Sequence, residues 1–217
     1  SSWTLTALPL FVWMGEILFR TKLSENLFEG LSPWMQKLPG GLIHVNVVGC
    51  ALFAAISGSS AATVATVGKM SIPELRKRNY PEKILLGSLA GSGTLGLLIP
   101  PSIILIIYGV TVQESIAKLF MAGILPGIMI AIIFMFYVII WSLINKKIMP
   151  QSFESFTLIE KLNRSKKLLP VITLILAVIG SIYTGIATAT EAASLGVVGS
   201  LILSYFQKSL TFENFKK

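Results

Sequence analysis

Four long apolar windows constrain this chain more than any other feature of its sequence. They are Trp3–Phe19, Ile84–Tyr108, Leu119–Ile144 and Leu168–Ile186. At a rise of about 1.5 Å per residue, each is long enough as a helix to cross a hydrocarbon core about 30 Å thick. The windows are continuously apolar and do not alternate, which argues against a transmembrane β-barrel. The sequence therefore predicts an all-α, polytopic helical membrane protein.

The charged residues are few, and their positions agree with this fold class. Only 13% of the 217 residues are charged, whereas soluble domains carry about 25%. The net charge of +8 comes from basic residues gathered in short connections, chiefly 73–83 and 145–167. Basic loops between apolar spans follow the positive-inside rule, so nucleic acid is not an expected partner. The single cysteine, Cys50, has no intrachain disulfide partner and is expected to be a small packing residue.

The pattern divides the chain into segments of one membrane domain. We expect a transmembrane helix at 1–19, an arm helix in the membrane interface at 20–39, a re-entrant hairpin at 40–72, a broken helix at 84–109, a transmembrane helix at 119–144 and a helix pair at 168–206. The arm helix is predicted because apolar residues recur at helical spacing in this segment. The alternative is a linker helix outside the membrane. Ser24 is expected to cap the arm, and Thr188 or Thr190 the last helix, with Glu191 at its positive end. Because the chain opens with Ser1 and not Met, and within the expected first span, we expect a piece of a longer protein.

The first interruption of an apolar run is Ser57-Gly58-Ser59-Ser60, inside Ala51–Gly68. Unpaired backbone groups are costly in lipid, so such a break needs protein or water around it. The segment Ala61–Ile72 spans only about 18 Å as a helix, which is too short to cross alone. Two alternatives remain, one kinked crossing or a re-entrant hairpin. Placing Pro73–Lys83 with the other basic connections on the cytoplasmic side favours the hairpin.

The second interruption is Gly91-Ser92-Gly93-Thr94, inside Ile84–Tyr108. With Gly96 it matches G-x-G-x-x-G, but a dinucleotide site needs a preceding strand, and Pro100-Pro101 follows too soon. Glycine and proline instead predict an unwound helix, whose free carbonyls and hydroxyls are oxygen ligands at membrane depth. Close packing of small residues is the alternative. Two such breaks in successive elements favour a binding site.

Several stretches resemble one family of membrane proteins. They are FAAISGSSAATVATVGKMSIPELRKRNY, AGSGTLGLLIPPSIILIIYG and SIAKLFMAGILPGIMIAIIF, and the likeness runs from ALPLFVWMGEIL to GIATATEAASLGVV. The family is the large membrane subunit of TRAP (tripartite ATP-independent periplasmic) transporters, typified by C4-dicarboxylate and sialic-acid uptake. GSGTLGLLIPPS is the most specific part of the match.

The resemblance implies more than the residues alone. It implies an elevator-type permease of two inverted repeats in the bacterial inner membrane, coupled to sodium, of which this chain holds mainly the first repeat. Its partners would be a small membrane subunit, a periplasmic solute-binding protein and a small organic carboxylate. The sodium candidates are Ser57, Gly58, Ser59, Ser60, Gly91, Ser92, Gly93 and Thr94. The substrate candidates are Ser59, Ser60, Thr63 and Thr94.

Two other functions fit parts of the sequence. The first is an ion-coupled carboxylate symporter that works without a binding protein. The second is an intramembrane serine hydrolase, but its only histidine, His44, would lie about 20 Å along a helix from Ser57, too far for proton transfer. The chain has no Asp, one His and one Cys, so it offers no cluster for a catalytic metal. We expect no cofactor apart from sodium as the coupling ion.

Overall fold

A computed structural model describes residues 3–20, 23–150 and 156–206, and all regular structure in these ranges is helical. The α-helices are α1 (Ala7–Phe19), α2 (Leu23–Met35), α3 (Ile43–Ser57), α4 (Ser60–Lys77), α5 (Glu82–Gly93), α6 (Ile103–Val112), α7 (Ile116–Ile144), α8 (Leu158–Ser165), α9 (Leu169–Tyr183) and α10 (Ala189–Phe206). Short 3₁₀ turns are η1 (Trp3–Thr6), η2 (Thr94–Leu97), η3 (Lys146–Ile148) and η4 (Lys166–Leu168). The prediction of an all-α fold is confirmed for these residues.

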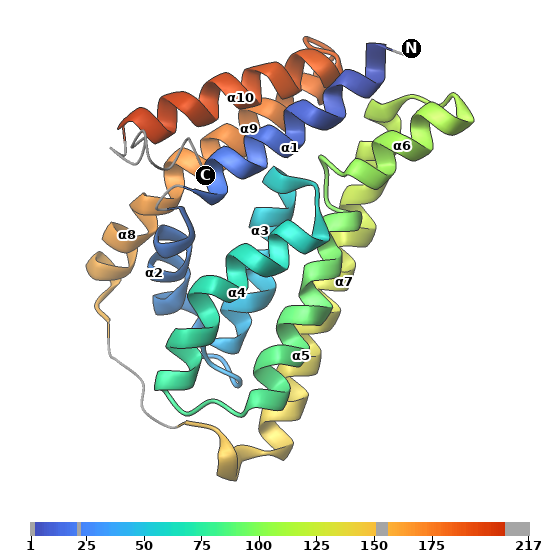
Figure 1. The fold of residues 1–217 in the computed structure, drawn as a ribbon. Coiled ribbons are helices and arrows are strands. Elements are labelled where there is room, and N and C mark those ends of the chain that lie inside the picture. Colours follow the sequence, from blue (N-terminus) through green and yellow to red (C-terminus); the bar gives the residue numbers. More distant parts are fainter. Residues whose placement is uncertain (1–2, 21–22, 151–155, 207–217) are drawn as a thin grey trace.

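The helices form two groups that meet near the end of α3 (Figure 1). One group is α1, α9 and α10, with α1 packed along α10. The other is α3, α4 and α5, with the long α7 behind α5. The arm helix α2 lies beside α8 and against α3. This arrangement places the turn between α3 and α4 close to α1.

Three helical stretches are long and apolar enough to cross a membrane: Ile116–Ile144, Leu158–Tyr183 and Ala189–Phe206. They agree with the expected spans at 119–144 and 168–206. Three further helices, α1, α3 and α6, are apolar but shorter. The 13-residue α1 rises about 20 Å, less than a bilayer core, so a complete crossing at 1–19 stays a prediction.

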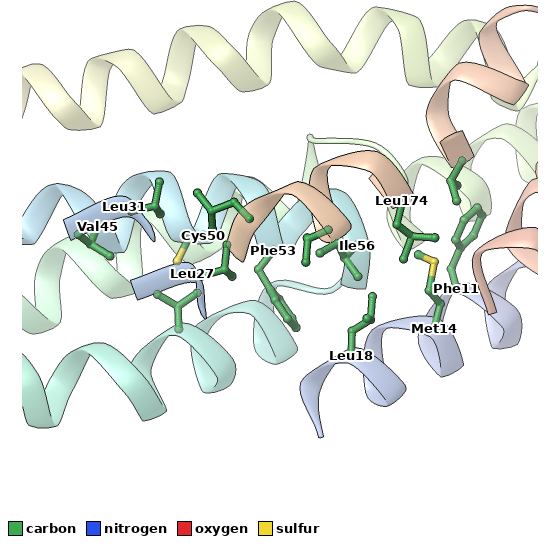
Figure 2. Close-up of a cluster of buried hydrophobic side chains, with 14 of the residues drawn as sticks. Phe11, Met14, Leu18, Leu27, Leu31, Val45, Cys50, Phe53, Ile56 and Leu174 are labelled. Atoms are coloured by element: carbon green, nitrogen blue, oxygen red, sulfur yellow. The ribbon is translucent and has the colours of Figure 1, made fainter. Parts of the chain in front are cut away.

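The core is centred on α3, which is buried on almost every side (Figure 2). Phe53 and Ile56 pack with Leu18 of α1 and Leu27 of α2 in one cluster. Such all-round burial explains why the sequence of α3 is apolar on every face. Cys50 is a free, fully buried member of this cluster, as expected.

Two local interactions lie at helix ends, and the second of them confirms a prediction from the sequence. Arg20 Nε donates to Glu16 Oε1 at 2.7 Å, one turn away on α1. At the start of α10, the backbone N–H of Glu191 donates to Thr188 Oγ1 at 3.4 Å, and Glu191 Oε2 accepts from the Thr188 N–H at 2.8 Å. Thr188 is therefore the cap, whereas Thr190 already lies inside the helix. The expected cap Ser24 has a side chain outside the described residues.

Two expected boundaries are wrong. The arm helix α2 stops at Met35, and tight turns rather than helix connect it to α3. The α4 helix does not end before Pro73 but continues to Lys77. Proline within a helix removes one backbone donor without forcing an end when the surrounding residues keep helical geometry. The second helix of the pair is therefore 18 residues long.

Candidate functional site

The first break is a tight turn, Ser57–Ser60, which we call the α3–α4 turn. Helix α3 ends at Ser57, and Gly58 adopts a left-handed conformation with φ of 60°. Ser59 is extended, and its hydroxyl caps α4 by accepting from the Ala62 N–H at 3.4 Å. Glycine reaches this φ without steric cost, so the Gly-Ser pair reverses the chain. As a result α3 and α4 lie side by side, as a hairpin requires.

The hydroxyl groups of the turn form a local network. Thr63 Oγ1 donates to the Ser59 carbonyl at 2.7 Å and lies 3.0 Å from Ser57 Oγ. Ser57 and Thr63 are fully buried, whereas Ser59 and Ser60 are half-buried. Thr63 therefore holds the shape of the turn, and Ser59 and Ser60 are the hydroxyls best placed to meet a ligand.

The second break lies later in the chain than predicted. Helix α5 runs through Gly93, and Thr94–Leu97 continues it as a 3₁₀ turn. The non-helical stretch is Leu98–Ser102, before α6. Proline lacks an N–H and restricts the residue before it, so Pro100-Pro101 stops the helix while Gly91 and Gly93 do not. The expectation that residues 91–94 are unwound is therefore wrong.

The two breaks touch each other. The Ile103 N–H donates to the Gly58 carbonyl at 3.2 Å, which joins the first turn of α6 to the α3–α4 turn. A methyl group on Gly58 would lie 2.6 Å from the Pro101 carbonyl oxygen. A methyl group on Gly96 would lie 2.9 Å from the backbone nitrogen of Ser60. Backbone therefore packs on backbone here, and only glycine fits at both positions.

A third element reaches the same place. Gly15 of α1 lies so close to the turn that a methyl group there would sit 2.9 Å from the Ser57 Cα. Sequence reasoning missed Gly15, Gly96 and Ser102, which caps α6 by accepting from the Leu105 N–H at 3.4 Å. The available signal was the length of the glycine-rich stretch, which extends past Thr94 to Gly96 and the two prolines.

The other predicted ligands do not all gather at this point. Gly93 packs on the first turn of α4, close to Val64. Ser92 is fully buried, and its hydroxyl donates to the Ser88 carbonyl and lies 3.4 Å from the Asn46 carbonyl, in the first turn of α3. Gly91 faces α7, and Thr94 is exposed with its hydroxyl donating to the Gly91 carbonyl at 2.7 Å. The structure thus brings Ser57, Gly58, Ser59 and Ser60 together with Gly93, and it directs the hydroxyls of Ser92 and Thr94 to backbone carbonyls of α3 and α5.

We call the place where the α3–α4 turn meets the Leu98–Ser102 stretch the junction. It offers two kinds of partner for a small ligand. Carbonyl oxygens at the end of α3 and in the Leu98–Ser102 stretch, with the Ser59 hydroxyl, are hard oxygen ligands suited to an alkali cation. The N-termini of α4 and α6 carry partial positive charge that favours a carboxylate. Among the described residues, no three His, Cys, Asp or Glu side chains are grouped to hold a metal ion.

His44 has a structural role at the far end of α3. Its ring Nε2 lies 2.8 Å from the Pro39 carbonyl, and the side chain is fully buried. Asn46, two residues on, donates to Ser88 Oγ at 3.0 Å. The turn serines lie about four helical turns away, so His44 has no route to act as their general base.

Comparison with known proteins identifies the family. Residues 1–217 match the family described as "Tripartite ATP-independent periplasmic transporter, DctM component". The chain belongs to this DctM family. It is a bacterial inner-membrane permease component and not an enzyme, so the hydrolase alternative is excluded.

Named relatives of this permease show how the match extends. The chain is 36% identical over 204 residues to the "C4-dicarboxylate TRAP transporter large permease protein DctM" of Pseudomonas aeruginosa. This match covers 94% of the chain and 47% of the relative. The chain is 35% identical to the "Isethionate TRAP transporter permease protein DctMQ" of Oleidesulfovibrio alaskensis (94% and 32%), and 32% identical to the "Ectoine/5-hydroxyectoine TRAP transporter large permease protein UehC" of Ruegeria pomeroyi (92% and 46%). The chain spans about half the length of most curated relatives that it matches.

Proposed function

We propose that this permease is the membrane-translocating part of a sodium-coupled secondary transporter that imports small organic carboxylates. A periplasmic solute-binding protein delivers the substrate, and a small membrane subunit completes the assembly. The α3–α4 pair enters and leaves the membrane from the same face as a re-entrant hairpin. In this account it moves with α5 and α6 as part of an elevator built from two inverted repeats.

One observation carries the proposal: the α3–α4 turn and the Leu98–Ser102 break are joined by the hydrogen bond from Ile103 to Gly58. Broken helices that meet at membrane depth are the usual site of substrate and coupling ions in secondary transporters. Helix ends supply carbonyls to the cation and N–H groups to the anion without any charged side chain. Ser59 and Ser60 contribute to sodium and substrate binding, with Thr63 as a positioning residue.

Transport by the reconstituted system tests this function. The complete permease, with its small subunit, is placed in proteoliposomes, and uptake of a panel of carboxylates is compared under sodium and potassium gradients. The proposal expects uptake that requires both sodium and the binding protein. Uptake driven by sodium alone would instead support the binding-protein-independent symporter, and uptake indifferent to sodium would overturn the coupling.

Ser59→Ala is expected to weaken sodium coupling. The substitution removes a hydroxyl whose cap hydrogen bond is long, at 3.4 Å, and which is half-buried beside the junction. We expect the sodium concentration that gives half-maximal uptake to rise about tenfold, the equivalent of about 1.4 kcal/mol. The measurement is uptake against sodium concentration in the same proteoliposomes.

The matched control is Ser115→Ala. Ser115 caps α7 by accepting from the Lys118 N–H at 3.5 Å, so its loss costs about the same helix stability. It is exposed and does not contact the junction. If both variants change sodium dependence equally, Ser59 acts only as a helix cap and is not a ligand.

A further inference from the structure

A pocket lies away from the junction of the two breaks, among α2, α4, Phe156 and α8. Its volume is about 390 Å³, and its lining mixes polar and apolar groups. Three basic side chains contribute to it: Lys69 and Arg78 from the α4 side, and Arg164 from α8. Two carboxylates, Glu29 and Glu74, also line it.

Both carboxylates of the pocket have cationic partners, and for Glu74 one of them is Arg78 of the pocket itself, whose Nε lies 3.9 Å from Glu74 Oε2. Glu29 pairs with Lys167, and Glu74 Oε1 lies 3.4 Å from Lys77 Nζ. By contrast, Lys69 lies over the Phe19 ring at 5.5 Å and Arg164 over the Phe156 ring at 4.3 Å. The ion pairs found in the described ranges include neither cation. Lys69 therefore carries a positive charge that no ion pair of the described ranges includes, and Arg164 adds a second that interacts electrostatically with Glu160, one turn before it on α8.

The surroundings of the pocket are those of a membrane interface. Aromatic rings gather beside the basic groups, as they do at the headgroup level of bilayers. Trp34 of α2 is 43% exposed, and its indole N–H donates to Ser165 Oγ at 2.8 Å. Lys161 lies over the same indole at 5.3 Å. Helix α2 itself is amphipathic, with Leu27 and Leu31 buried toward α3.

We propose that this pocket binds the phosphate of an anionic phospholipid headgroup. Lys69 and Arg164 contact the phosphate, and the rings of Phe19 and Phe156 hold their side chains in place. Basic pockets between membrane helices bind such headgroups through the attraction of Lys and Arg to anionic lipid. The lipid would connect the arm helix α2 to α4. This inference does not depend on which substrate is carried or on sodium coupling.

Lipid binding to the purified complete permease tests the proposal. Dissociation constants for palmitoyl-oleoyl phosphatidylglycerol and the matching phosphatidylcholine are measured by native mass spectrometry. The wild type is expected to bind the phosphatidylglycerol more tightly. A Lys69→Gln/Arg164→Gln double variant should lose about fivefold in affinity per charge, or about 25-fold in all. Equal affinity of the wild type for the two lipids would overturn the proposal.

Two further variants separate a built site from general charge. Lys146→Gln/Lys147→Gln removes the same charge from exposed residues of η3 and should leave phosphatidylglycerol binding unchanged. Lys69→Arg/Arg164→Lys keeps the charge and should restore most of the affinity, which a folding defect would not allow. The proposal is contradicted if Lys146→Gln/Lys147→Gln lowers the affinity for phosphatidylglycerol as much as Lys69→Gln/Arg164→Gln does. It is also contradicted if Lys69→Arg/Arg164→Lys does not recover the affinity.

A competition experiment distinguishes a lipid headgroup from free phosphate as the source of the phosphate. Inorganic phosphate is added as a competitor to the phosphatidylglycerol complex at millimolar concentration. The proposal expects little displacement, because a lipid also has its acyl chains against the apolar surface of the helices. Displacement by inorganic phosphate at micromolar concentration would assign the pocket to a free anion and overturn the assignment to lipid.

Discussion

Gly58→Ala is expected to destabilise the complete permease by about 2–5 kcal/mol and to abolish most uptake. A left-handed conformation costs a residue with a side chain about 1–2 kcal/mol. The added methyl group would also meet the Pro101 carbonyl oxygen at 2.6 Å, a backbone atom that cannot rotate away. Relief requires the α3–α4 turn to move from the Leu98–Ser102 break, which breaks the hydrogen bond from Ile103. The thermal unfolding midpoint of the purified protein and its uptake rate measure the two effects.

Gly185→Ala is the control for backbone strain. Gly185 has a φ of +72°, yet a methyl group there would meet no atom within 4 Å. It therefore carries the conformational cost without the collision. We expect the unfolding midpoint to fall in the order wild type, Gly185→Ala, Gly58→Ala. Equal midpoints for the two variants would show that the contact between turn and break contributes nothing.

Gly96→Ala is expected to lower sodium affinity by about tenfold while leaving the protein folded. A methyl group on Gly96 would lie 2.9 Å from the Ser60 nitrogen and 3.0 Å from the Ser59 carbonyl carbon. Both are backbone atoms, so η2 and the α3–α4 turn must separate by several tenths of an ångström. A binding site works only when its ligating atoms stay within about 0.5 Å of the productive geometry. The sodium dependence of uptake measures the change.

Its control is Gly87→Ala in α5. Gly87 is exposed, and a methyl group there would meet no atom within 4 Å. Alanine is a better helix former than glycine by up to about 1 kcal/mol, so this variant should be as stable as the wild type or more stable. If uptake by Gly96→Ala and by Gly87→Ala depends on sodium concentration in the same way, the close approach of η2 to the α3–α4 turn has no role in sodium binding.

The sequence predicted the helical class, the long spans and the first break because these features are local. Apolar length identifies α7, α9 and α10, and Gly58 between serines identifies the α3–α4 turn. The position of the second break was mistaken because glycine permits unwinding but does not impose it. Residues 91–93 remain helical where α3, α4 and α7 surround them, and the chain leaves the helix only before Pro100.

The contacts of the candidate site could not be predicted in the same way. The hydrogen bond from Ile103 to Gly58 and the approach of Gly15 to Ser57 join residues far apart in the sequence. Such contacts depend on how helices pack, which a single apolar pattern does not specify. Ser92 and Thr63 illustrate the consequence, since their hydroxyls bond to carbonyls of the chain itself, Ser92 to Asn46 and Thr63 to Ser59.

Sodium binding to the purified complete permease tests the central claim most directly. The thermal unfolding midpoint is measured against sodium concentration, with potassium at equal ionic strength as the reference. A ligand present at ten times its dissociation constant stabilises the folded state by about 1.4 kcal/mol. We predict a midpoint that rises with sodium, does not rise with potassium, and responds only weakly to sodium in Gly96→Ala. A wild-type midpoint that is the same in both salts would contradict the claim that the joined breaks form a sodium site.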